Sequence, residues 1–256
     1  MARRRHSNRR RRRGNFGFLY KLLSVLVICG AVVAALTLFF RVDHIVVSGT
    51  QRYTDDEVIA ASRVELGDNL FLLNKYEVAR HIAEDLPYID IEDIWIRRDL
   101  PDTLLIDVEE CSAVFAVVQG GSAWLVSPKG KIVEQRPAAQ ALDEPVIDGC
   151  ELLAPSVGTD MALATEYAGR QASLLALLAA LDDQQLLDQV QAIHLADPGQ
   201  LTMDYADRFT VEMAYGADYE RMLQILTGAI GKLESNQTGT FHLDPESEYE
   251  AVLTLD

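Results

Sequence analysis

Residues 42–62 read VDHIVVSGTQRYTDDEVIAAS, and residues 66–110 read LGDNLFLLNKYEVARHIAEDLPYIDIEDIWIRRDLPDTLLIDVEE. The first stretch opens with a β-rich run from Val42 to Val47, which ends in turn-forming residues and predicts a strand. Thr54 then stands three residues before Glu57, which is the spacing of a capping box. A helix is therefore expected to begin at this point.

The second stretch repeats the same helix signal. Asn74 stands three residues before Glu77, and apolar residues follow at intervals of four, at Val78, Ile82 and Leu86. These intervals place the three side chains on one face of a second helix. The proline directly after Leu86 is expected to end that helix.

Two strands are expected to complete this unit. Residues 89–96 are rich in isoleucine, residues 97–102 form a turn with a proline, and residues 103–108 return to β-forming residues. The order β-α-α-β-β within about 70 residues predicts one small α+β domain.

An uncharged apolar segment precedes this domain. Leu22 to Phe40 reads LLSVLVICGAVVAALTLFF, 19 residues without a charge. At ~1.5 Å per residue a helix of this length spans the ~30 Å hydrocarbon core of a bilayer once. A cleaved signal peptide is the alternative, because Val33-Ala34-Ala35 resembles a cleavage site. The apolar run continues past that point to Phe40, which favours a retained transmembrane helix and a partner in the lipid bilayer.

The charges on the two sides of this segment differ in sign. Ten of the 23 basic residues lie within the first 41 residues, where no acidic residue occurs. Residues 42–256 carry 13 basic against 39 acidic side chains, a net charge of −26. The positive-inside rule then predicts a cytoplasmic leader, residues 1–21, and an external C-terminal part. An acidic body argues against nucleic acid as a partner.

The rest of the chain, residues 111–256, predicts a second domain of mixed α/β character built on a mainly antiparallel sheet. A hairpin is expected around Pro128-Lys129-Gly130, and two helices are expected at Leu163–Leu181 and Asp218–Leu233. The strands are expected at 114–118, 124–127, 131–134, 190–195, 200–205, 209–213, 240–243 and 249–255, and residues 145–149 are a short apolar piece between chain-breaking residues.

Residues 41–110 resemble a POTRA domain of the kind that follows the transmembrane helix in the FtsQ/DivIB family of bacterial cell-division proteins. The resemblance rests on Gly49 after the first strand, Gly67-Asp68-Asn69 before the second helix, Leu86-Pro87-Tyr88 at its end, and the turn Arg98-Asp99-Leu100-Pro101-Asp102-Thr103. One departure is Cys111-Ser112-Ala113, where relatives often show an arginine and then a proline.

The second domain resembles the same family, through WLVSPKGKIVE, PVIDG, RFTVEMAYGADYERMLQILTGAI and GTFHLD in that order. The resemblance implies a single-pass protein of the cell membrane at the division septum, with no catalytic activity. It also implies that the external part binds division proteins of the FtsB/DivIC and FtsL type and helps to regulate septal peptidoglycan synthesis.

The C-terminal strand carries the expected binding site. The resemblance implies that Tyr249, Ala251, Val252 and Leu253 receive the FtsB/DivIC partner. The period of two places Tyr249, Ala251 and Leu253 on one face and Val252 on the other. An ordinary inner strand whose apolar side chains fill the core is the alternative, and a slip of one residue in register would reverse the faces.

No constellation in the sequence predicts catalysis, a cofactor or a small-molecule substrate. The histidines lack metal-ligand spacing, although His242 and Asp244 would share one face of a strand. Ser127 and Lys129 suggest a nucleophile pair, but a turn between strands explains them better. Cys111 and Cys150 could form a disulfide, which the sequence leaves open.

Two other classes of function remain as alternatives. The first is a POTRA-bearing chaperone or translocation module that binds extended polypeptides, and the second is a membrane-anchored cell-wall enzyme. The absence of a recognisable nucleophile or metal set in the sequence counts against the enzyme.

Overall fold

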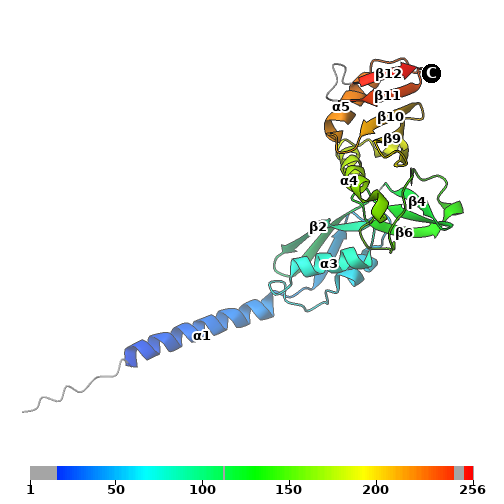
Figure 1. Cartoon of the computed structure of the whole chain (residues 1–256). Coiled ribbons are helices and arrows are strands. Elements are labelled where there is room, and N and C mark those ends of the chain that lie inside the picture. The colour runs from blue at the N-terminus through cyan, green and yellow to red at the C-terminus, as the bar shows by residue number, and fades with distance from the viewer. Residues whose placement is uncertain (1–15, 112, 245–250, 256) are drawn as a thin grey trace, which may run out of the picture.

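The structure, a computed structural model, describes residues 16–111, 113–244 and 251–255. One long helix, α1 (Phe16–Phe39), extends away from the rest of the chain (Figure 1). Its segment Gly17–Phe39 is 23 residues long, wholly unburied and apolar enough to cross a membrane. The length and composition of α1 therefore fit the predicted membrane protein.

A three-stranded sheet and two helices follow α1. The strands β1 (His44–Ser48), β2 (Ile89–Asp99) and β3 (Thr103–Glu110) lie in the order β1-β3-β2, with β1 parallel and β2 antiparallel to β3. The helices are α2 (Asp55–Ser62) and α3 (Lys75–Asp85). The predicted order β-α-α-β-β is confirmed.

The start of each of these helices is set by the residue that the sequence analysis singled out. Thr54 and Glu57 form both hydrogen bonds of a capping box at the start of α2. At the start of α3 the Asn74 side chain accepts a hydrogen bond from the backbone N–H of Tyr76. The apolar faces of both helices pack on the sheet, with Val58 and Ile82 fully buried in one cluster.

The second part of the chain forms a nine-stranded sheet in the order β12-β11-β10-β9-β8-β7-β4-β5-β6. Five of its eight strand pairs are antiparallel and three are parallel, as predicted for a mainly antiparallel sheet. The strands are β4 (Phe115–Gln119), β5 (Ser122–Val126), β6 (Ile132–Pro137), β7 (Val146–Asp148), β8 (Val190–His194), β9 (Gln200–Tyr205), β10 (Phe209–Ala214), β11 (Gly239–Leu243) and β12 (Ala251–Leu255).

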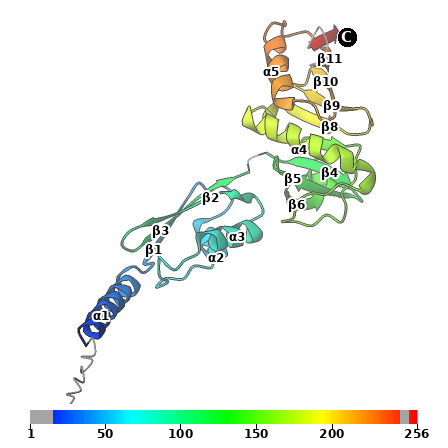
Figure 2. The ribbon, with the colours of Figure 1, turned by 60° about the vertical axis from the view of Figure 1, so that its left-hand side comes forward.

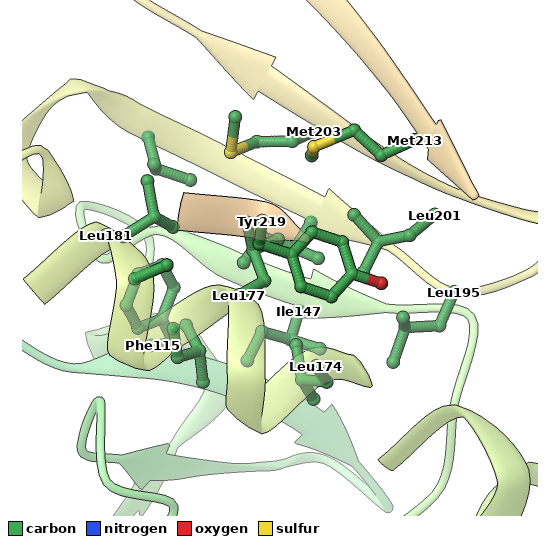
Figure 3. Close-up of a cluster of buried hydrophobic side chains, with 14 of the residues drawn as sticks. Phe115, Ile147, Leu174, Leu177, Leu181, Leu195, Leu201, Met203, Met213 and Tyr219 are labelled. Atoms are coloured by element: carbon green, nitrogen blue, oxygen red, sulfur yellow. The ribbon is translucent and has the colours of Figure 1, made fainter. Parts of the chain in front are cut away.

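Two helices, α4 (Ala168–Asp183) and α5 (Tyr219–Ile230), cover one face of this sheet. Their buried side chains interdigitate with those of the strands, and Figure 3 shows Leu177 of α4 and Tyr219 of α5 beside Met203 of β9. This cluster is the main hydrophobic core. The three-stranded sheet lies between α1 and the nine-stranded sheet, and β11 lies at the end farthest from α1 (Figure 2).

The helices α4 and α5 differ from their predicted ranges mainly at the start of α4 and at the end of α5, and by one or two residues at their other ends. Leu163 forms a bridge with Leu152 and is not helical, so α4 begins only at Ala168, after a short 3-10 turn. The helix α5 ends at Ile230, and Gly231 is its C-cap residue. The backbone N–H groups of Lys232 and Leu233 bond to carbonyls three residues back, at Ala229 and Ile230, so the last predicted residues form a tighter turn and not an α-helix.

The junction between the two sheets is built around a buried lysine. The Lys131 ammonium donates to the backbone carbonyls of Ala83 and Ile89, both at 2.9 Å, and lies 3.6 Å from a carboxylate oxygen of Asp90. Burial lowers the pKa of Lys131 and raises that of Asp90. Nearby, the Tyr88 hydroxyl donates to Glu134 at 2.5 Å. These bonds connect the end of α3 and the start of β2 to the β5–β6 hairpin.

We expect Lys131→Met to lower the free energy of unfolding by about 2–4 kcal/mol, because it leaves two carbonyls and the partly buried Asp90 carboxylate without their partner. Urea unfolding of the full chain in detergent, followed by circular dichroism, measures the change. Lys129→Met is the matched control, since Lys129 pairs with Asp93 at a more exposed site and its loss should cost less than about 1 kcal/mol. Equal effects of the two substitutions would contradict a structural role for the Lys131 contacts.

Candidate partner-binding edge

The strand β12 forms one edge of the nine-stranded sheet. It pairs antiparallel with β11, from Leu243 opposite Ala251 to Gly239 opposite Leu255. Within the residues that the structure describes, no strand pairs with its outer side. An edge strand presents unpaired backbone N–H and C=O groups, which an extended segment of another chain can pair with.

A glycine sets the close approach of β11 to β12. A Cβ atom added to Gly239 would lie 2.1 Å from the Thr254 carbonyl oxygen, so no other residue fits there without moving the strand. Because β11 runs parallel to β10, the chain must cross from one to the other, and α5 makes this connection. The helix α5 thereby comes to lie against β11 and β12.

The side chains of β12 fall on two faces. Ala251 and Leu253 are partly buried against the main core, whereas Val252 lies on the opposite face and is 45% exposed. Tyr249, the fourth residue of the predicted binding site, lies outside the described residues. Among the three described residues of the predicted set, the side chain most accessible to a partner is therefore Val252.

The face that carries Val252 is polar and is not covered by α4 or α5, whose side chains pack on the opposite face. Val252 lies opposite His242 in the strand register, and His242 Nδ1 is 2.7 Å from a carboxylate oxygen of Glu212 on β10. The sequence also predicts that His242 and Asp244 share a strand face, and Asp244 lies one residue beyond the end of β11 at Leu243.

A second histidine on this face joins three strands. His194 on β8 places Nδ1 2.9 Å from Asp148 on β7 and Nε2 3.1 Å from Asp204 on β9. Both ring nitrogens of histidine can donate to carboxylates only when the ring is an imidazolium. Partial burial opposes the charged form, but the hydrogen bonds to Asp148 and Asp204 outweigh it and raise the pKa of His194.

In the sequence these histidines show only a lack of metal-ligand spacing. The residues that they contact come from neighbouring strands, as far as 46 positions away in the chain for His194 and Asp148. Only the register of the sheet reveals such a pair, so no local signal in the sequence could have found it. Among the described residues, no group of three histidine, cysteine or acidic side chains is placed to hold a metal ion.

The three-stranded sheet offers a second exposed surface. An open groove of about 800 Å³ lies between α3 and β2, and Tyr76 and Trp95 are among the residues that line it. Tyr76 is largely exposed and Trp95 is about half exposed. The strand β2 is also an edge strand of its sheet. The groove is therefore a second place where a polypeptide could bind.

The side chains considered for chemistry at the sequence level have structural partners. Lys129 pairs with Asp93, and buried Ser127 accepts a hydrogen bond from the backbone N–H of Lys131. Cys111 and Cys150 are free thiols, and burial raises their pKa values to about 12 and about 11. Thiols with raised pKa values are poor nucleophiles at neutral pH.

Comparison with known proteins found a match to the family described as "POTRA domain, FtsQ-type" over residues 40–110. A cell division protein DivIB of Clostridium acetobutylicum is 31% identical over 135 residues, which cover 52% of this chain and 53% of that protein. A cell division protein FtsQ of Geotalea daltonii is 27% identical over 214 residues, 81% of this chain and 73% of that protein. The chain thus matches about half the length of the first relative.

The geometry of His194 predicts a pH dependence of stability. A histidine whose pKa is raised by folding adds stability that is fully present below its unfolded pKa of ~6.5 and is lost as the pH rises through the higher folded value. We therefore expect His194→Gln to reduce the free energy of unfolding most near pH 6, by about 1 kcal/mol or less at this partly exposed site.

Urea unfolding of the wild type and of His194→Gln across pH 6 to 9 measures this difference. The difference should shrink as the pH rises, because the wild-type ring loses its proton. A difference that stays constant over the whole range would show that the charge of His194 is not what stabilises the three strands.

Proposed function

The chain belongs to the FtsQ/DivIB family of bacterial cell-division proteins, and we propose that it acts in the division machinery as a non-catalytic scaffold. In this proposal α1 anchors the protein in the cell membrane at the division septum, with the N-terminus in the cytoplasm. The external part then binds division proteins of the FtsB/DivIC and FtsL type. The resulting complex helps to regulate septal peptidoglycan synthesis.

The observation that carries the proposal is the edge at β12. The described part of this strand has no charged residue and no proline, the features that commonly keep an edge from pairing with other chains. Val252 adds an exposed apolar contact beside the free backbone groups. A partner that extends the sheet along β12 would gain both main-chain hydrogen bonds and this contact.

The charges and the length of the apolar segment support the proposed topology. Nine cations precede the uncharged segment Leu22–Phe40, and Arg41 follows it directly. The positive-inside rule then favours an external location for both sheets. A single membrane helix and an external binding edge are the arrangement that a membrane-anchored scaffold needs.

The proposal is tested with Val252→Lys. We expect this substitution to weaken capture of the cognate external segments of FtsB/DivIC and FtsL by tenfold or more, about 1.4 kcal/mol in binding free energy, because it places a charge beside the paired edge. Purified full chain in detergent, titrated with the partner segments and read by biolayer interferometry, measures the affinity.

Val118→Lys is the matched control. Val118 lies on β4 of the same sheet and is similarly exposed, but β4 has strands on both sides. Capture by the wild type that is lost with Val252→Lys and kept with Val118→Lys supports the site. Equal binding by both variants would place the partner elsewhere, and no binding by the wild type would count against the division scaffold itself.

A second candidate function is the binding of extended polypeptides in the groove between α3 and β2, for which exposed Trp95 is the supporting observation. Against this alternative, β2 carries both acidic and basic side chains and a register shift between Ile89 and Ile94. Charges and bulges protect an edge from pairing. If the groove is the binding site, Trp95→Ala should abolish capture of the partner segments in the same titration. Under the scaffold proposal it should leave their capture unchanged.

A further inference from the structure

Exposed apolar side chains gather where α1 meets the three-stranded sheet. Leu66, Phe71 and Leu72 are 70%, 46% and 77% exposed, and they belong to the loop between α2 and α3. Tyr76, in the first turn of α3, is also largely exposed. We call these four residues the apolar loop patch. A patch of this kind on an otherwise acidic body marks an interaction surface.

The loop is joined to the end of α1 by backbone hydrogen bonds. Val42 N–H donates to the Asp68 carbonyl and Gly67 N–H donates to the Val42 carbonyl, each at 2.8 Å. Leu70 N–H donates to the Phe40 carbonyl at 3.0 Å. The patch therefore has a fixed position relative to α1.

An asparagine from the loop also caps the helix. The Asn69 side-chain amide donates to the Leu36 carbonyl at 3.0 Å. Leu36 lies in the last turn of α1, where carbonyls have no partner within the helix. In addition, the rings of Phe40 and Phe71 meet edge to face, with centroids 5.0 Å apart.

These contacts set the depth of the loop. Leu36 lies four residues before Phe40, which corresponds to roughly 6 Å along the helix axis. The uncharged segment Leu22–Phe40 is about as long as the hydrocarbon core is thick. If this segment spans the core, the Leu36 carbonyl lies inside the edge of the core on the external side. A side chain that bonds to this carbonyl must itself reach the membrane surface.

The loop is chemically suited to such a position. Residues 69–74, NLFLLN, contain no charge. The backbone N–H groups of Phe71 and Leu72 are both satisfied by the Asn69 side-chain oxygen, at 2.9 and 3.2 Å. Backbone groups near hydrocarbon must be satisfied internally, because little water is present to bond them.

We propose that the apolar loop patch inserts into the outer interface of the bilayer that α1 crosses. The patch contacts the lipid surface, because it is fixed beside the end of the membrane helix. Phe71 and Tyr76 then lie where aromatic side chains concentrate in membrane proteins. This second attachment limits rotation of the three-stranded sheet about the axis of α1, and it rests on the proposed insertion of α1.

The test uses tryptophan fluorescence of the full chain in vesicles of phosphatidylethanolamine and phosphatidylglycerol, with or without bromine on the acyl chains. Leu72→Trp reports on the patch, Leu38→Trp on the membrane helix, and Leu142→Trp on a site of similar exposure near the end of β6. The wild type supplies the background of the native tryptophans. We expect brominated lipid to quench most of the added fluorescence of Leu72→Trp and Leu38→Trp, and little of that of Leu142→Trp.

Two other outcomes would overturn the inference. Quenching of Leu38→Trp with Leu72→Trp no more quenched than Leu142→Trp would leave α1 in the membrane and the patch in water or against another protein. The absence of quenching at both Leu38→Trp and Leu72→Trp would remove the membrane anchor as well, and with it that part of the proposed function.

Discussion

The whole arrangement depends on the rule that buried polar groups must be paired. The hydrogen bonds of the buried Lys131 ammonium meet this rule at the junction and so connect the two sheets. Its two carbonyl partners lie at the end of α3 and the start of β2, so the ammonium keeps its hydrogen bonds only while the sheets hold one relative position. At the other end of the three-stranded sheet, Asn69 satisfies a carbonyl of α1. Polar pairing thus runs from the membrane helix to the nine-stranded sheet.

A continuous series of fixed contacts has a mechanical consequence. If α1 is held in a bilayer, the contacts of Asn69 and Lys131 carry the edge at β12 at a set distance and orientation from the membrane. A partner anchored in the same membrane would then meet β12 with less loss of orientational freedom than a partner in solution. Pre-organisation of this kind raises affinity by lowering the entropic cost of binding.

Local signals in the sequence predicted the first sheet well and the details of the second less well. The capping box at Thr54 and the apolar face of α3 depend on residues within a few positions of one another, so the sequence displays them directly. The bridge that holds Leu163 out of α4, the carboxylates around His194 and the Asn69 cap join residues at least ten positions apart. Such contacts depend on strand register and chain packing, which periodicity does not encode.

The four sheet edges differ in how they avoid pairing with other chains. Charges occur along β2, β6 contains Glu134 and Arg136 and ends in Pro137, and β1 is a short strand that follows directly from the membrane helix. The described part of β12 has no charged residue and no proline, and it exposes Val252 beside its free edge. An apolar edge without such protection invites aggregation unless a partner covers it. The unprotected edge at β12 therefore fits the proposal that a partner strand covers it, because a covered edge does not aggregate.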